Sequence, residues 1–160
     1  MISLSGFGYE DILKEPSNLF ANTWQTKSFI NGPAVKNFEK TFAEYCGAEQ
    51  CVAVSSCTSA LQLSLLALGI GPGDEVITVP YTWVSTVEVI RQVGAKPVFV
   101  DISLSDMCID PKEVSKKICK KTKAIIGVDL YGNVCDVDEL KKFGVPVIQD
   151  SAQSTGALYK

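Results

Sequence analysis

Histidine is missing from this sequence of 160 residues. Its absence excludes serine–histidine and cysteine–histidine nucleophilic catalysis within the chain. The six cysteines contain no pair in C-x-x-C spacing, so a zinc site has little support either. Several of them fall in segments expected to be core strands or helices, where cysteine behaves as a small hydrophobic residue. We therefore predict reduced thiols, no metal and a cytoplasmic location.

Long apolar runs and an excess of one charge are also lacking. The longest apolar stretch, residues 61–70, is interrupted by Gln62, Ser64 and Gly69 and is too short to span a bilayer. The N-terminus has no basic segment followed by an apolar core, so we expect no signal peptide. The net charge is −3, with both signs interspersed. We expect neither a nucleic acid nor a membrane as partner.

The apolar residues that are present follow a regular order. Their share of 46%, with 21% charged residues, is typical of a globular domain with a sizeable core. A helix is expected to begin at Pro33 and to end at Gly47. Strands and helices then alternate, with strands expected at 51–54, 75–79, 97–100, 123–128 and 145–148, and helices at 58–68, 83–93, 111–119 and 137–143.

Strands rich in Val and Ile, without polar alternation and separated by helices, indicate a parallel sheet covered on both faces. The predicted fold class is therefore α/β, with three layers. Right-handed crossovers place the carboxyl ends of all five strands at one edge, where ligands of such folds bind. The residues that follow the strands are thus the candidates for a site: 55–58, 80–83, Asp101, Asp129 and 150–153.

The glycine-rich run at 69–73 does not indicate a nucleotide loop. It follows a helix and precedes a strand, which is the reverse of the order in a dinucleotide-binding fingerprint. We interpret its glycines as the end of the helix and a turn. The first strand-to-helix connection has no glycine triplet, which argues against a nicotinamide-binding Rossmann unit.

Three features of the candidate edge each allow more than one interpretation. The small residues of 55–59 either cap the following helix or bind a phosphate at its N-terminus, with about equal weight. Trp83 either fills the core or offers a stacking surface to a planar ring. Asp150 is a helix cap, a metal ligand or the partner of a buried cation.

A single ligand would account for all three features. A carboxylate such as Asp150 keeps a pyridine nitrogen protonated by raising its pKa, and a protonated ring is the better electron sink. Gln153, three residues later, is placed to donate to a hydroxyl of such a ring. A phosphate site, an aromatic face and an anion at one edge together indicate a phosphorylated, planar and protonatable heterocycle.

Several motifs resemble one known family, the DegT/DnrJ/EryC1/StrS sugar aminotransferases. These are enzymes that depend on pyridoxal 5′-phosphate (PLP) and have the aspartate-aminotransferase-like fold, fold type I. The resemblance runs from about Phe29 to Lys160. The motifs stand in the family's order at 54–61 (VSSCTSAL), 68–77 (LGIGPGDEVI), 81–86 (YTWVST), 94–101 (GAKPVFVD), 122–126 (TKAII), 130–132 (LYG) and 146–153 (PVIQDSAQ).

The resemblance implies a role for five residues. Cys57 and Thr58 would hold the PLP phosphate, Trp83 would stack on the ring, Asp150 would pair with the ring nitrogen and Gln153 would approach the ring hydroxyl. The family moves an amino group, typically from glutamate, to a keto-sugar attached to a nucleotide. Its members act as homodimers whose sites use both subunits.

The sequence departs from the family at three points. Position 57 is usually glycine, so Cys57 would be strained if the backbone there needs a positive φ. Asp129 stands where many members have histidine. The lysine that forms the Schiff base with PLP comes later in the family, so no catalytic residue is assigned within this chain and that lysine is expected beyond Lys160.

The resemblance implies that residues 1–32 form an N-terminal arm with a short helix and that residues 33–160 form an incomplete PLP-binding large domain. Its leading interpretation is the N-terminal portion of an aminotransferase that is inactive by itself. Two alternatives remain: a PLP-dependent sugar dehydratase of the same family, in which histidine replaces the catalytic lysine, and a non-catalytic remnant of the fold.

Overall fold

A computed structural model describes residues 9–159. The chain divides into two compact units, of which the first ends at Ala53 and the second begins at Val54. Within the described residues, none of the helices is both long and apolar enough to cross a membrane.

The first unit contains two helices, α1 (Tyr9–Thr26) and α2 (Pro33–Cys46). Proline in the first turn of α2 fits because this position needs no backbone N–H donor. The helix ends at Gly47, whose left-handed φ of 65° is readily adopted by glycine. Phe38 and Phe42 stack one turn apart, with ring centroids 5.4 Å apart. The helix predicted from Pro33 is confirmed.

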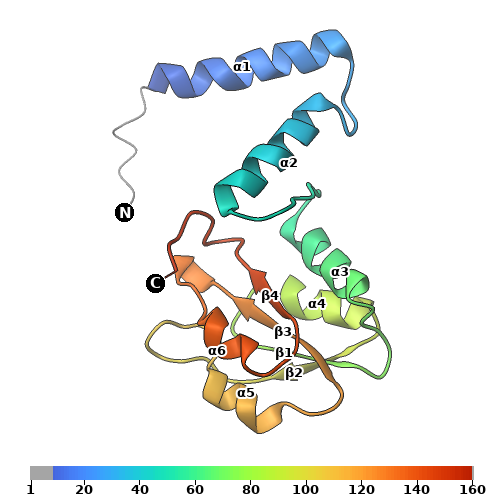
Figure 1. The fold of residues 1–160 in the computed structure, drawn as a ribbon, viewed down its shortest axis with the longest axis vertical. Coiled ribbons are helices and arrows are strands. Elements are labelled where there is room, and N and C mark those ends of the chain that lie inside the picture. Colours follow the sequence, from blue (N-terminus) through green and yellow to red (C-terminus); the bar gives the residue numbers. More distant parts are fainter. Residues whose placement is uncertain (1–8, 160) are drawn as a thin grey trace. The chain divides into compact units, whose positions relative to one another are not determined.

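The second unit is built around a parallel sheet of four strands in the order β2-β1-β3-β4 (Figure 1). Its elements follow one another as α3 (Cys57–Ala67), β1 (Glu75–Thr78), α4 (Ser85–Gln92), β2 (Lys96–Phe99), α5 (Pro111–Lys117), β3 (Thr122–Val128), the 3-10 turn η2 (Leu130–Gly132), α6 (Val137–Lys141) and β4 (Val147–Asp150).

Two apolar cores lie on opposite faces of this sheet, because successive side chains of a strand point to opposite sides. One core joins Val76 of β1 and Ile126 of β3 to residues of α3 and α4, including Leu65. The other joins Ile77 and Ile125 to residues of α5 and α6. Helices therefore cover both faces (Figure 1), which confirms the predicted three-layer α/β class.

The strand predicted at 51–54 is not formed. In the described part of the chain these residues pair with no strand, and Val52 is exposed. A strand exists only where a neighbouring backbone receives its N–H groups. The N–H of Ala53 instead donates to the Glu39 carboxylate at 2.9 Å. The prediction of five strands is therefore wrong, because the first of them is absent from the sheet of four strands.

Other boundaries differ by a few residues. The helix expected from residue 83 begins at Ser85, so Trp83 lies in the connection before α4. The last strand extends to Asp150, which makes this residue part of the sheet. Gly69 and Gly73 have φ values of 70° and 94°, and they form the turn that was predicted in place of a nucleotide loop.

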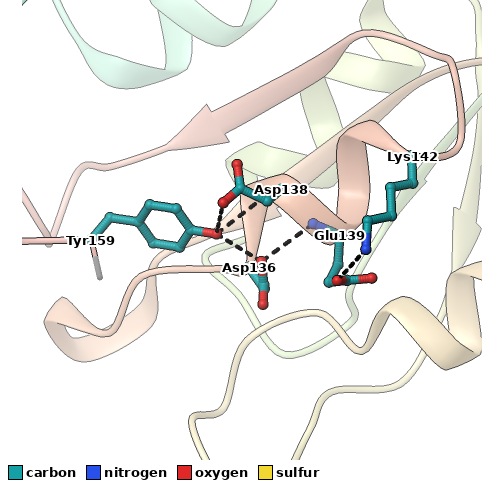
Figure 2. A network of polar contacts seen from close by, with 5 residues as sticks. All are labelled: Asp136, Asp138, Glu139, Lys142 and Tyr159. Atoms are coloured by element: carbon teal, nitrogen blue, oxygen red, sulfur yellow. Dashed lines mark hydrogen bonds and ion pairs between the residues drawn. The ribbon is translucent and has the colours of Figure 1, made fainter.

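The segment that follows β4 is fastened to the N-terminus of α6 (Figure 2). The Tyr159 hydroxyl lies 2.7 Å from an Asp136 oxygen and 3.0 Å from an Asp138 oxygen, and it accepts from the Asp138 N–H at 3.3 Å. Asp136 also caps α6 by accepting from the Glu139 N–H at 3.2 Å. One tyrosine thus holds the end of the described chain against a helix cap.

Replacement of Leu65 by alanine should destabilise the second unit by about 2–5 kcal/mol, because it leaves a cavity in the core shared by α3, α4 and the sheet. The matched control is Leu66→Ala, since Leu65 is 0% exposed and its neighbour Leu66 is 52% exposed. The control should change stability by about 0.5 kcal/mol or less. Urea unfolding, monitored by circular dichroism, measures the stability of both variants. Equal losses of stability would contradict the placement of α3.

Candidate functional site

A buried carboxylate lies at the carboxyl end of β4. Asp150 is 7% exposed, so its oxygens require hydrogen-bond donors. The Thr86 hydroxyl, from α4, donates to Oδ2 at 3.2 Å. The Cys57 thiol, from α3, and the N–H of Ala152 donate to Oδ1, each at 3.3 Å. Two helices and the turn after β4 therefore converge on one carboxylate.

The N-terminus of α3 is directly beside this carboxylate, because Cys57 is the first residue of the helix. Ser56 is the N-cap, and its side chain accepts from the Ser59 N–H at 3.2 Å. The first N–H groups of a helix have no partner within the helix, and they carry a partial positive charge. The cap takes up the N–H of Ser59, so capping by Ser56 does not exclude an anion at the other N–H groups of this first turn.

The cysteine at position 57 fits its backbone without strain. The described residues other than glycine with positive φ are Lys27, Asn31, Met107 and Tyr131, and Cys57 is not among them. Desolvation by burial is the main factor that raises the pKa of its thiol from 9.0 to about 11, and the hydrogen bond and the negative charge of Asp150 add to it. The thiol is therefore a stable donor at neutral pH.

Thr58 and Trp83 occupy the same edge but do not touch Asp150 through any recorded hydrogen bond. Thr58 lies half-buried in the first turn of α3. Trp83 is 74% exposed, which contradicts the core-filling interpretation of this residue. Its backbone oxygen accepts from the Thr86 N–H at 3.1 Å, so its position is tied to the helix that carries an Asp150 donor.

Gln153 is oriented by the connection that follows β3. Its side-chain oxygen accepts from the Tyr131 N–H at 2.7 Å, which leaves its amide nitrogen as a donor for other groups. Tyr131 has the left-handed conformation, with φ 58° and ψ 19°, which is uncommon outside glycine. Its hydroxyl lies 3.0 Å from the hydroxyl of Tyr81, from the connection after β1.

The sequence did not reveal the roles of Thr86, Tyr81 and Tyr131. One feature of the sequence could have indicated that Thr86 has a buried polar partner. It is a polar residue on the face of α4 that also carries the buried Val89 and Ile90. The contact between Tyr81 and Tyr131 joins positions fifty residues apart, and only the pairing of β1 with β3 brings them together. No cluster of three side chains that could hold a metal ion occurs among the side chains that the structure describes.

The donor set suits a ligand that has an anionic group and a protonated nitrogen. The N-terminus of α3 attracts the anion, and the buried Asp150 attracts the cation. The two groups are close together, because the thiol of the first helical residue lies 3.3 Å from the Asp150 carboxylate. PLP has both groups, and the residues present therefore fit it.

The chain belongs to the DegT/DnrJ/EryC1/StrS aminotransferase family, which matches residues 10–160. The resemblance expected from the motifs is thereby confirmed. Since the family's enzymes are aminotransferases, the chain is part of an enzyme family and not only of a fold.

Two curated relatives are similar over most of the chain. The UDP-2-acetamido-2-deoxy-3-oxo-D-glucuronate aminotransferase of Pseudomonas aeruginosa is 46% identical over 136 residues, which are 82% of this chain and 38% of the relative. The spore coat polysaccharide biosynthesis protein SpsC of Bacillus subtilis is 42% identical over 162 residues, covering 99% of this chain and 40% of the relative. The chain thus spans about two fifths of the length of these relatives.

A solved structure supports the fold and the cofactor. The crystal structure of NtdA from Bacillus subtilis with bound cofactor PMP, the amino form of PLP, matches with a TM-score of 0.86 and 33% identity. It covers 91% of this chain, which corresponds to 34% of that structure. PLP as the cofactor of the family is confirmed.

The contact between Cys57 and Asp150 predicts a pH profile for alkylation. Because the pKa of Cys57 is raised to about 11, its reaction with iodoacetamide should rise up to that pH, well above the ordinary 9.0. Asp150→Asn removes the charge and should shift the midpoint to a value between the two, since the burial remains. Mass spectrometry of the Cys57 peptide measures both profiles. Identical profiles would contradict the contact.

Proposed function

We propose that this chain supplies the PLP-binding part of an aminotransferase that acts on a nucleotide-linked keto-sugar, with glutamate as the amino donor. The observation that carries the proposal is the buried Asp150, in contact with the N-terminus of α3 through Cys57. This arrangement offers an anion for a ring nitrogen and a helix N-terminus for a phosphate within one site.

Each predicted residue has a role in this proposal. Thr58 and the backbone at Cys57 hold the phosphate, and Trp83 covers a face of the ring. Asp150 holds the proton on the ring nitrogen, while Thr86 fixes the carboxylate from α4. Gln153 is turned by the Tyr131 N–H, so its amide nitrogen is the group that meets the ring hydroxyl. When bound, PLP supplies the electron sink for the carbon that carries the amino group.

The substrate class rests on the relatives. The Pseudomonas aeruginosa relative is named for a UDP-linked 3-oxo sugar acid, and SpsC is named for spore coat polysaccharide biosynthesis. The first of these names gives a nucleotide-linked keto-sugar, which agrees with the substrate class expected from the family, and the second gives only a polysaccharide pathway. We extend it to the protein that contains this chain.

The chain by itself is proposed to be inactive, and the positions of four described lysines support this proposal, since none of the four is placed to form a Schiff base beside Asp150. Lys96 and Lys123 stand at the amino ends of β2 and β3, whereas Asp150 is at the carboxyl end of β4. Lys116 and Lys142 are paired with Glu113 and Glu139 on their own helices.

The remaining expectations are also proposals. A cytoplasmic location is supported by the six cysteines, which are all free thiols. The expectation of a homodimer rests on the family alone. The division into residues 1–32 and 33–160 is kept as a proposal about domains in the complete enzyme.

Asp150→Asn should weaken PLP binding about 10- to 100-fold, because the ring nitrogen loses its anionic partner. Binding is measured in a Trp24→Phe background, in which Trp83 is the remaining tryptophan of the two, by quenching of its fluorescence.

Asp101→Asn is the matched control for this experiment. Asp101 also follows a strand at this edge, but within the described residues its carboxylate accepts from the adjacent Ile102 N–H, at 2.8 Å, and not from the helices that meet Asp150. The control should bind PLP as the parent does. Absence of quenching in the parent, or equal affinities in both variants, would contradict the proposed site.

The reaction is tested on the full product of the gene, with glutamate and a UDP-linked 3-keto-sugar. The expected products are 2-oxoglutarate and an aminated sugar, measured by coupled assay and mass spectrometry. Loss of a sugar hydroxyl without amination would favour the dehydratase. The 160-residue chain, assayed beside it, should form no 2-oxoglutarate, and turnover by the chain would show that one of its own lysines serves.

A further inference from the structure

Asp129 is the second buried carboxylate at this edge, and it takes no part in the proposed binding of PLP. It directly follows β3 and is 1% exposed. Its Oδ2 accepts from the Gln149 amide at 2.7 Å, from the Ser154 hydroxyl at 2.8 Å and from the Ser151 hydroxyl at 3.0 Å. Its Oδ1 accepts from the Cys135 N–H at 3.0 Å.

Three of these four donors belong to one short segment, which also carries Asp150 and Gln153. Gln149 and Ser151 are the neighbours of Asp150 in the sequence, and Ser154 directly follows Gln153. A fifth link joins the backbones, since the N–H of Asp129 donates to the Asp150 carbonyl at 3.0 Å. One carboxylate therefore ties both ends of the turn that presents Asp150 and Gln153.

Neutral groups surround this carboxylate. The thiol of Cys135 stays protonated, because burial, followed by the nearby Asp129, raises its pKa. No ion pair with Asp129 is recorded in the described part of the chain. A carboxylate can accept from all of these donors at once, whereas an amide of the same shape has one oxygen and must turn a donor toward other donors.

We propose that Asp129 is a positioning residue that fixes the turn 149–154 and thereby the placement of Asp150 and Gln153. The effect of Asp129 on PLP binding rests on the proposed function. The effect of Asp129 on the position of Asp150 is independent of that function.

The thiol of Cys57 reports the position of Asp150 without any cofactor, because Asp150 contributes to its raised pKa. Asp129→Asn should therefore shift the alkylation profile of Cys57 toward lower pH, in the direction of the Asp150→Asn profile. A purely structural role would lower stability in urea while leaving the Cys57 profile of the folded protein unchanged. That outcome would overturn the proposal.

Tyr159→Phe is the matched control. It releases the far end of the same segment from Asp136 and Asp138 without touching Asp129 (Figure 2). The Cys57 profile of this variant should equal that of the parent; an equal shift in both variants would overturn the proposal, since general loosening would explain it. If Asp129→Asn does not fold, Ser151→Ala combined with Ser154→Ala removes two tethers, and an unchanged Cys57 profile there would also overturn it.

Binding of PLP provides a second readout through double-mutant cycles. Asp129→Asn should weaken binding about tenfold in the parent and clearly less in an Asp150→Asn background, because Asp129 acts through Asp150. In a Thr58→Ala background, which alters the phosphate end, the full loss should persist. Equal losses in both backgrounds would overturn the proposal. If the parent binds no PLP, the proposed function fails, and the Cys57 profile still decides the role of Asp129.

Discussion

Two carboxylates buried side by side at the ends of adjacent parallel strands impose the constraint on which the rest of this edge depends. Asp129 follows β3, Asp150 ends β4, and the N–H of Asp129 donates to the Asp150 carbonyl at 3.0 Å. Each carboxylate is almost inaccessible to water, so each must find donors within the protein. Within the described residues, no buried side-chain nitrogen or oxygen is left without a partner.

The turn after β4 donates to both carboxylates, and their other donors come from opposite sides of the sheet. Asp150 is approached by α3 and α4, through Cys57 and Thr86, on one side of the sheet. Asp129 is approached by the turn after β4 and by Cys135, which belongs to the core on the other side. Under the proposed function the first carboxylate meets the ligand and the second keeps the first in place.

Much of the fold could be predicted from the sequence, because helices and strands whose formation depends on nearby residues leave clear patterns in it. Runs of Val and Ile between helices predicted the parallel sheet, and Pro33 with Gly47 predicted α2. Prediction was wrong at 51–54, where the apolar pattern of a strand was present but no pairing partner for its backbone is found in the described chain. Thr86 was missed because its polarity is explained only by a carboxylate 64 residues away.

The sequence by itself predicted most of the helices and strands, the edge proposed for a site and the membership of a family. It made Asp150 a candidate because this residue follows an apolar strand at the edge where the carboxyl ends of the strands meet, and the family resemblance implied its pairing with a ring nitrogen. Only the tertiary structure decided which side chains share that carboxylate, that Cys57 is free of strain, and that Asp129 ties the turn after β4. The physical reason is that hydrogen bonds between distant segments depend on the register of β1, β3 and β4, and no local pattern encodes that register.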